Sequence, residues 1–496
     1  MSLYTVVDGM FVSRLVGTDA FSAVNIVYPL LSFVIALGTM FGTGITAIVS
    51  RKLGEGKQQE ACENVTFITL FAVGLGILIT VLSFVFLEKI IYMLGANEDI
   101  YAYCYAYAFP LLFFQPANIL QLEFQSLFVA NGKPHIGLTV TVAGGLANVI
   151  LDYVFIGILD MGISGAAVAT GIGYCIPAFF SIFYFIFNRK AQLHFVKPKM
   201  DWKVLLHSMT NGSSEMVSNL SGSITTFLFN IIMMRLVGNE GVAAISILLY
   251  LDFVLIAISL GYSMGVAPLF SYNYGGGNIP KLRKLYKISI GFCMGVGVVM
   301  TVGTLLFSGN LASVFAERGS RVYELATAGL SVYAFGYVFK GYNIFSSAMF
   351  TAFGDGKVSA ILSFMRTLVF LVLFLIGFSI LFGVSGVWSA SVAAELMAFA
   401  LAVFYTVRKK QHIITFPEFP EHEIWTRTDE YSILKGNDSV GLRIHCADRK
   451  KVYHGLAKIP SPKAILHGFL LATVRALNSY TESNDLSAGL GEGGCA

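Results

Sequence analysis

Several long apolar stretches of the sequence contain side chains that can exchange a proton or bind a cation. In the first half these side chains belong to Asp8, Asn148, Asp152 and Thr170. Charged groups inside a membrane span are energetically costly and default to a functional role. Two carboxyl groups buried close together can share one proton and release it when hydration or geometry changes. We therefore expect a cation-binding site here, with hydrogen bonds that only hold the helices together as the alternative.

The four residues fall in one layer if each apolar stretch is a helix. At 1.5 Å per residue, Asp8 lies about 13 Å from the glycine that follows its stretch at position 17. Asp152 and Thr170 each lie eight residues from the end of their stretches, which is about 12 Å. Asn148 and Asp152 are spaced i, i+4 and share one helix face. Three helices would thus place carboxylate, amide and hydroxyl groups at the same depth.

The second half carries a different set of charges within its apolar stretches. They are Glu215, Asp252, Lys340, Arg366 and Glu395. A carboxylate in an aromatic cavity attracts a lipophilic cation, and the rings add cation–π attraction. Because a lone buried charge is unfavourable, we expect Lys340 to neutralise Glu215 or Asp252. Arg366 and Glu395 are expected to form a structural pair.

We assign the charges Glu215, Asp252 and Lys340 to substrate binding, together with two glutamines of the first half. Gln121 and Gln125 lie deep in their stretch and could reach the layer of Asp152. Hydrogen bonds that only pack helices explain these glutamines equally well. Four tyrosines at alternate positions from 101 to 107 fit an interfacial aromatic belt better than a binding site.

The composition places the whole chain in a membrane. Hydrophobic residues make up 56% of the 496 residues and charged residues 12%, against about 25% charged in soluble domains. The mean hydropathy is +0.72. The sequence also repeats itself at an offset of 221: Arg14–Gly17 returns as Arg235–Gly238, and Gly162–Gly165 matches Gly383–Gly386. A repeat of this length indicates a duplicated domain, which is common in membrane transporters.

The apolar stretches predict an all-α polytopic protein of about twelve transmembrane helices, since a span needs about 20 apolar residues. They lie near 1–16, 22–50, 64–94, 100–130, 136–159, 162–187, 205–237, 243–273, 286–315, 321–353, 358–382 and 385–407. Six per half gives both halves the same orientation, as a parallel repeat. The predicted parts are a first lobe (1–187), a linker (188–204), a second lobe (205–410) and a polar tail (411–496).

Loop charges predict the orientation. One side carries many lysines and arginines, at 51–57, 133, 189–203, 281–287, 357 and 408–410. The other side carries only Arg14, Lys89, Arg235, Arg318 and Arg321. The positive-inside rule makes the first side cytoplasmic, with both termini and the linker on that side. The first helix is short at about 15 residues, against the usual 20. We expect the tail to be poorly structured or a non-native extension.

Several motifs fall in the order and spacing of one family. Val7–Gly17 followed by Ser50–Gly56 resembles the multidrug and toxic compound extrusion (MATE) family. Pro268–Gly275 and Gly383–Trp388, with Glu395 downstream, are similar to its MepA-like bacterial branch. The resemblance covers roughly residues 1–410. It implies a V-shaped, two-lobe antiporter of the plasma (inner) membrane, which exports small amphipathic and often cationic compounds against a proton or sodium gradient.

The resemblance also implies roles for individual residues. Asp8, Asn148, Asp152 and Thr170 match the family's cation network in the first lobe, position by position. Glu215 resembles a carboxylate on the seventh helix of sodium-coupled relatives. Those relatives add an acid on the tenth helix, where residues 337–353 contain only Lys340. This difference favours a proton as the coupling ion. We expect no metal or cofactor beyond that ion, no nucleic-acid partner and a monomer.

Three alternatives remain: a flippase of the same superfamily, an enzyme, and a non-functional homologue. A flippase for a lipid-linked precursor would need a cationic cavity for pyrophosphate, whereas the charges here are mixed but acid-rich. A membrane-embedded enzyme would need clustered histidines or a nucleophile beside a base, and His135, His194 and His207 are dispersed. We therefore do not expect an enzyme. The short first helix and the unusual tail leave a non-functional truncated homologue as the third alternative.

Overall fold

Apolar sequences of this length fold into helices because a helix satisfies its own backbone hydrogen bonds, which lipid cannot do. The computed structural model describes residues 8, 9, 11–413 and, within the tail, 426–427, 431–435, 439–445 and 452–458. The chain forms two units, residues 1–414 and 415–496. Half of the predicted first helix (1–16), namely residues 1–7 and 10, lies outside the described residues.

The first lobe follows the predicted spans closely. Its helices are a π-helical segment Val12–Val16, α2 Thr18–Gly54, α3 Gln58–Val85, α4 Leu87–Met93, α5 Glu98–Leu112, α6 Gln115–Ala130, α7 Pro134–Asp152, a second π-helical segment Tyr153–Ile158 and α8 Gly162–Phe187. Residues 113–114 interrupt the predicted span 100–130, between Pro110 in α5 and Pro116 in α6. Proline removes a backbone donor and explains such a break.

The second lobe repeats this pattern. Its helices are α9 Trp202–Leu236, α10 Asn239–Gly275, α11 Ile279–Ser313, α12 Arg321–Tyr333, a short 3₁₀ turn Ala334–Gly336, α13 Tyr337–Ala352, α14 Gly356–Phe364, a π-helical segment Met365–Phe370 and α15 Leu371–Ile413. Gly383 has φ +56° inside α15 and breaks it where the sequence predicts the boundary between two spans. The described part of α15 runs to Ile413, just beyond the predicted end of the second lobe at 410.

Eight helices of the described part are long and apolar enough to cross a membrane. The run 356–409 counts as one of them although the kink at Gly383 divides it into two predicted spans. Two further spans are interrupted, between α5 and α6 and between α12 and α13. With the first span only partly described, the helices agree with the predicted all-α architecture of about twelve spans.

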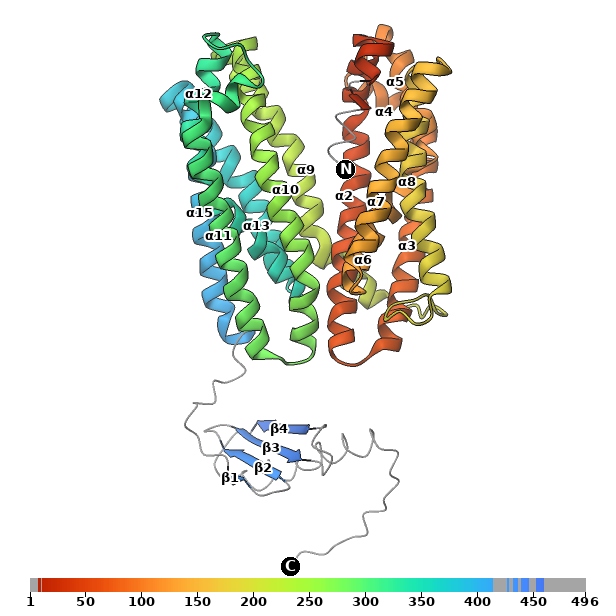
Figure 1. The fold of residues 1–496 in the computed structure, drawn as a ribbon, viewed down its shortest axis with the longest axis vertical. Coiled ribbons are helices and arrows are strands. Elements are labelled where there is room, and N and C mark those ends of the chain that lie inside the picture. Colours follow the sequence, from red (N-terminus) through yellow and green to blue (C-terminus); the bar gives the residue numbers. More distant parts are fainter. Residues whose placement is uncertain are drawn as a thin grey trace, which may run out of the picture. The chain divides into compact units, whose positions relative to one another are not determined.

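The two lobes form separate helical bundles that come together at one end (Figure 1). Glycines allow the backbones of α2 and α9 to touch there. A Cβ atom on Gly212 would lie 1.9 Å from the Met40 carbonyl oxygen, and one on Gly44 would lie 2.1 Å from the Ser208 carbonyl oxygen. Since no side chain fits at these distances, the close approach of α2 and α9 requires glycine.

A second glycine contact joins α2 to α10 and follows the internal repeat. A Cβ atom on Gly54 would lie 2.0 Å from the Tyr272 carbonyl oxygen, and one on Gly275 would lie 2.1 Å from the Arg51 carbonyl oxygen. Gly54 and Gly275 are 221 positions apart, as are Arg51 and Tyr272. The two halves therefore use equivalent residues to contact each other.

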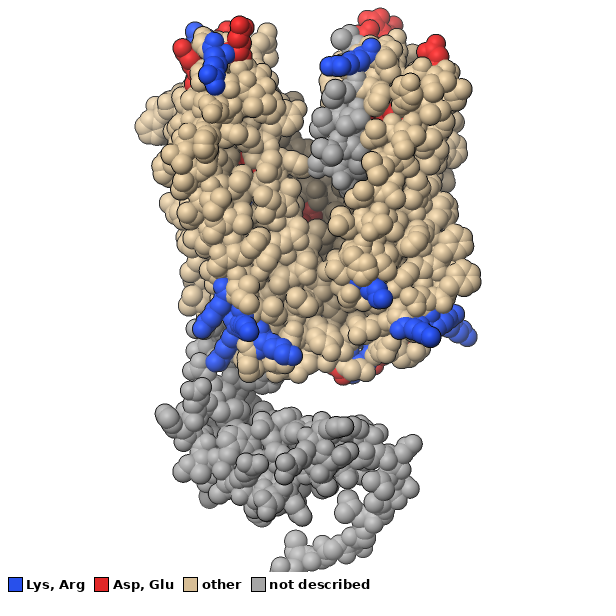
Figure 2. Space-filling view, viewed as in Figure 1, with Lys and Arg blue, Asp and Glu red and all other residues tan. Residues whose placement is uncertain are grey.

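A cleft separates the lobes at the opposite end (Figure 2). Lysine and arginine side chains gather at the closed end, and acidic atoms are visible inside the cleft (Figure 2). We call the closed end, where Arg51 and Gly275 meet, the basic end. The V-shaped arrangement predicted from the sequence is thus present, with its opening away from the basic end.

Helix α9 belongs to both lobes. At its start, the Trp202 ring packs edge-on against Phe67 and Phe71 of α3, with ring centroids 5.6 and 6.1 Å apart. Near its end, Phe229 and Met233 lie in the core of the second lobe. One helix thus connects the interior of one bundle to the interior of the other.

The linker between the lobes closes the basic end of the first lobe. The backbone N–H of Leu193 donates to the side chain of Asn131 at 3.0 Å. The backbone N–H of Val196 donates to the Thr66 hydroxyl at 3.0 Å. These bonds fix the linker under α3 and α6, beside the start of α9.

Within the tail, the structure describes an antiparallel sheet that the sequence analysis did not predict. Its strands are β1 Thr426–Arg427, β2 Tyr431–Lys435, β3 Ser439–His445 and β4 Val452–Lys458, in the order β1-β2-β3-β4 (Figure 1). The order follows the chain, so each strand pairs with the next one in sequence.

We predict that Gly212→Ala separates α2 from α9 at the basic end, because the added methyl group overlaps the Met40 carbonyl. Overpacking of this kind costs about 1–3 kcal/mol. Ser208 is buried at this contact, so Ser208→Cys should react with a maleimide faster in the Gly212→Ala background. Gly222→Ala, in the same helix with open space around it, is the control. Equal reaction rates for the two alanine variants would contradict the prediction.

Candidate functional site

Two buried carboxylates of the first lobe lack the partners that usually accompany buried charge. Asp8 is 5% exposed and Asp152 is fully buried. Both carboxyl oxygens of Asp152 lack a hydrogen-bond partner among the described residues. At least one carboxyl oxygen of Asp8 also lacks a partner there. The two carboxylates lie close enough for Asp8 to act electrostatically on Asp152. An unpaired carboxylate pair in an apolar interior favours binding a proton.

The position of Asp152 is set by an irregular helix. Asp152 is the last residue of α7, and the π-helical segment Tyr153–Ile158 follows it directly. π-helical turns are rare and occur frequently at functional sites. The π-helical segment Val12–Val16 packs against the one after Asp152 and against α8. The two carboxylates therefore lie beside irregular turns that contact each other.

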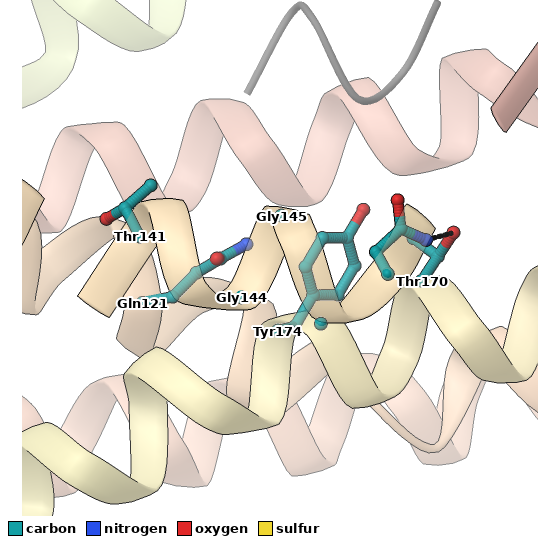
Figure 3. Close-up of a pocket in the computed structure, with 8 residues that line it drawn as sticks. Gln121, Thr141, Gly144, Gly145, Thr170 and Tyr174 are labelled. Carbon is teal, nitrogen blue, oxygen red and sulfur yellow. Dashed lines mark hydrogen bonds between the residues drawn. The ribbon is translucent and has the colours of Figure 1, made fainter. Parts of the chain in front are cut away.

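The side chains of Asn148 and Thr170, predicted to lie at the same depth, are hydrogen-bonded to each other. The Asn148 side-chain amide donates to the Thr170 hydroxyl at 3.3 Å (Figure 3). Glycines bring the two helices together: a Cβ atom on Gly144 of α7 would lie 2.6 Å from the Gly173 carbonyl of α8. The carbonyl oxygen of the Asn148 side chain has no partner among the described residues. It remains available to a bound cation or proton.

A small pocket adjoins this hydrogen bond. It is lined by Gln121, Thr141, Gly144, Gly145, Asn148, Thr170, Gly173 and Tyr174 (Figure 3). Gln121 thus reaches the layer predicted from the sequence, with Asn148 and Thr170. Gln125, one turn farther along α6, is not one of the lining residues and is only partly buried.

A chain of amides holds Gln121 in place along α6. Its side-chain N–H donates to Asn118 at 3.0 Å, and Asn118 donates to Gln115 at 3.3 Å. Gln115 in turn donates to the Leu111 carbonyl at 2.9 Å, across the break between α5 and α6. Because each amide donates to the next group along α6, the series fixes the orientation of Gln121, which lines the pocket.

Four of the charges inside the second lobe are paired with each other. The Lys340 ammonium lies 2.7 Å from Asp252 and 3.6 Å from Glu395. Arg366 lies 3.4 Å from Glu395, as the sequence predicts. Asp252, Lys340 and Glu395 are each 4–5% exposed. Lys340 therefore neutralises Asp252 rather than Glu215, and the four charges sum to zero.

Neutral groups complete this network. The Tyr333 hydroxyl donates to Asp252 at 3.2 Å, and the Asn343 amide donates to Glu395 at 2.7 Å. The structure thus places Asp252 and Lys340 inside the second lobe, satisfied by their own neighbours. A buried pair of this kind stays stable only when its hydrogen bonds are also satisfied.

Glu215 is the acid left over near this network. It lies on α9 and is only partly buried, and Arg366 acts on it electrostatically without forming an ion pair. One turn along, the Asn219 amide donates to the Glu215 carbonyl at 2.9 Å and to Thr39 of α2 at 3.2 Å. Because Gly212, about one turn away on α9, contacts Met40 where the lobes meet, we infer that Glu215 lies at the floor of the cleft.

Comparisons with known proteins agree with this architecture. A family model described as MatE matches residues 1–154 and 216–376. The chain belongs to the MatE family. This confirms the predicted MATE transporter of the MepA-like branch.

Relatives and solved structures of MATE proteins match most of the chain. The multidrug export protein MepA of Staphylococcus aureus (strain MRSA252) is 25% identical over 421 residues, covering 83% of this chain and 91% of MepA. MepA of Staphylococcus saprophyticus is 24% identical over 417 residues, covering 82% and 90%.

Two solved structures share the fold. One is an outward-facing conformation of a multidrug resistance MATE family transporter, with a TM-score of 0.78 at 23% identity, covering 83% of this chain and 92% of that one. The other is a mutant MATE transporter of Vibrio cholerae, with a TM-score of 0.77 at 20% identity, covering 83% and 93%.

Tyr107 corrects one expectation for this MATE protein. The sequence placed it with Tyr103 and Tyr105 in an interfacial belt, but only those two are exposed. Tyr107 is 2% exposed and lies within electrostatic reach of Asp8 and Asp152. Helical spacing could have shown this, because position 107 shares the buried face of α5 with positions 104, 108 and 111.

Glu123 is a second residue that sequence reasoning passed over. It is an acid in the middle of α6 and is fully buried. The Thr69 hydroxyl of α3 donates to it. The rule that picked out Asp8 and Asp152 applies equally to this residue, since a charge inside a span defaults to function.

We predict that Lys340→Met strongly destabilises this MATE protein, because Asp252 and Glu395 would lose their shared cation. Breaking a buried pair on one side costs about 3–5 kcal/mol. Titration with SDS in mixed micelles measures the free energy of unfolding. The double variant Asp252→Asn/Lys340→Met, which removes both charges of the closest pair, should recover part of the loss. If Lys340→Met alone is as stable as the wild type, Lys340 does not neutralise Asp252 and Glu395 as proposed.

Proposed function

We propose that this transporter exports small amphipathic cations in exchange for protons, by alternating access. The observation that carries the proposal is the unpaired carboxylate pair, Asp8 and Asp152, in the first lobe of a molecule whose cleft opens at one end only. A group that must gain and lose a proton cannot be held in a permanent ion pair. These two acids meet that condition, whereas Asp252 and Glu395 do not.

The names of the relatives support a role in multidrug export. The staphylococcal proteins similar to this chain are called multidrug export proteins, and one similar structure is called a multidrug resistance transporter. We extend this role to the present chain as part of the proposal.

The basic end is proposed to face the cytoplasm. Loop lysines and arginines gather there, and the positive-inside rule assigns such loops to the cytoplasmic side. The cleft would then open to the outside of the plasma (inner) membrane, with both termini cytoplasmic. In this orientation the structure corresponds to the state that releases substrate outward. We expect the protein to act as a monomer with no cofactor beyond the coupling ion.

The proposed cycle follows from the charges. In the outward-open state, Asp8 and Asp152 take up a proton from outside, which removes negative charge from the first lobe. Helices around the Asn148–Thr170 hydrogen bond then repack, and a bound cation leaves. The cytoplasmic side opens next, the proton leaves, and a new substrate binds. Protonation and substrate binding thus alternate because protonation of Asp8 and Asp152 repacks the first lobe and weakens its hold on the bound cation.

Glu215 supports a cationic substrate. With Asp252, Lys340, Arg366 and Glu395 balanced, Glu215 is the surplus acid at the floor of the cleft. It would attract a lipophilic cation, while an anionic lipid precursor would be repelled. The absence of an acid from α13 favours proton over sodium coupling, because the only charged residue of this helix is Lys340.

We predict that Asp8→Asn and Asp152→Asn each abolish export driven by a pH gradient, because an amide cannot carry the proton. Export of ethidium from proteoliposomes, with pH and sodium gradients imposed separately, measures this. Membrane insertion should stay intact, since the amide has the same size. Asp19→Asn, near the open end of α2, is the control. Unchanged efflux in both site variants would overturn the assignment.

We predict that Glu215→Gln weakens binding of tetraphenylphosphonium about tenfold, which corresponds to about 1.4 kcal/mol. The loss reflects one missing charge at the cleft floor. Equilibrium binding to purified protein at constant pH measures it. Glu240→Gln, at the exposed pair with Arg321, should bind as the wild type does. An unaltered affinity would place the substrate away from Glu215.

A further inference from the structure

Glu123 occupies a polar position that the proposed cycle does not use. It lies on the face of α6 that meets α2 and α3. One carboxyl oxygen accepts a hydrogen bond from Thr69, and the other has no partner among the residues described. The residue is fully buried. A carboxylate in such a place is strongly disfavoured unless a cation or several donors surround it.

No cation compensates Glu123 in the described part of the chain. Several titratable side chains lie on the helices packed against α6, in the half of the lobe toward the basic end. They are Arg51 and Lys52 on α2, Glu55 directly after it, Glu60, Cys62 and Glu63 on α3, His135 on α7, Tyr184 on α8, and Tyr272 and Tyr274 on α10. Arg51 bonds to Glu55 and Lys52 to Glu60. In the half of the lobe toward the open end, the neighbouring helices carry Asp152 on α7 and Tyr174 and Cys175 on α8. Thr69 is the side chain that bonds Glu123. A neutral, protonated carboxyl group is the form that fits this environment.

The position of Glu123 relates it to the closed end of the cleft. A Cβ atom on Gly42 of α2 would lie 3.3 Å from the Glu123 Cα, so the two backbones nearly touch. Two residues along α2, Gly44 contacts Ser208 of α9, where the lobes meet. Helix α2, whose glycines allow close approach on both sides, therefore lies directly between Glu123 and the contact of the lobes at Gly44 and Ser208. Movement of α2 away from α9 would bring water toward this carboxyl group.

Glu123 is also distinct from the carboxylate pair in depth. It precedes the α6–α7 loop at Asn131 by eight residues, which is about 12 Å of helix from the basic end. Asp152 lies at a similar depth from the opposite end. The two acids thus lie on opposite sides of the middle of the lobe, each nearer to a different aqueous face.

We propose that Glu123 is a second proton-binding site, which holds a proton while the basic end is closed and releases it to water on that side when α2 separates from α9. The O–H bond of the carboxyl group breaks, the proton passes to water, and the Thr69 hydroxyl stabilises the carboxylate. This inference rests on the proposed proton-coupled cycle, in which Asp8 and Asp152 take up protons at the open side. It supplies an acid for release at the other side.

Infrared difference spectra of the purified protein in lipid nanodiscs test the site directly. A protonated carboxylic acid gives a carbonyl band that is lost on ionisation. We expect Glu123→Gln to remove one such band from the neutral-minus-alkaline difference spectrum, while Asp152→Asn removes another. Thr69→Val keeps the acid but removes the donor that favours its ionised form, so the band should persist to higher pH. Glu60→Gln, an exposed acid at the same end, should leave these bands unchanged.

Transport separates this site from a purely structural acid. Glu123→Gln should slow ethidium export driven by a pH gradient about tenfold, while ethidium affinity stays within about twofold. The isosteric amide preserves packing, so an acid that only fills space would tolerate it. Wild-type transport by Glu123→Gln, or a spectrum that keeps all its bands, would overturn the proposal. If Asp8→Asn and Asp152→Asn both export normally while the Glu123 band still titrates, the proposed cycle fails and this site stands.

Discussion

The contact of α2 with α9 and α10 is the constraint on which the other features of the transporter depend. At Gly44, Gly212, Gly54 and Gly275 the backbones approach so closely that no Cβ atom fits. Because this contact lies at the basic end, the bundles can separate only at the other end, and the cleft opens there. The same contact separates the acids from the two aqueous sides in different ways. Asp8 and Asp152 lie toward the open end, whereas Glu123 lies nearer the basic end, where the contact of the lobes is closed.

The two lobes differ in whether their buried charges are paired. In the second lobe, Lys340 and Arg366 neutralise Asp252 and Glu395, and neutral donors satisfy what remains. In the first lobe the buried acids Asp8, Glu123 and Asp152 form no ion pair with any residue that the structure describes, and each has a carboxyl oxygen without a hydrogen-bond partner there. An ion pair resists a change of protonation, whereas an unpaired acid responds to one. The duplicated scaffold thus combines a lobe whose buried charges are paired with a lobe whose buried acids would carry the proton in the proposed cycle, and Glu215 adds one acid between them.

Much of the fold could be predicted from the sequence, because helical spans and an internal repeat are local patterns. The layer of Asn148 and Thr170 followed from counting residues along helices. Partners could not be predicted in the same way: Lys340 reaches Asp252 across 88 positions, and sequence alone left Glu215 as an equal choice. Tyr107 was misplaced because alternation along the chain was read in place of helical spacing. Glu123 was missed although its position in a span was visible, since its importance depends on contacts with α2 and α3.

Helix α9 must change shape whenever the lobes change their angle. Its first turn is fixed to α3 by Trp202, and its last turns are fixed in the second core by Phe229 and Met233. Between these ends, residues 211–226 are mostly serine, threonine, asparagine and glycine. Such residues stabilise a helix weakly and allow it to bend. The helix is therefore held firmly at both ends and can bend between them. In the proposed cycle, bending of α9 would store elastic energy and so contribute to the relative stability of the two states.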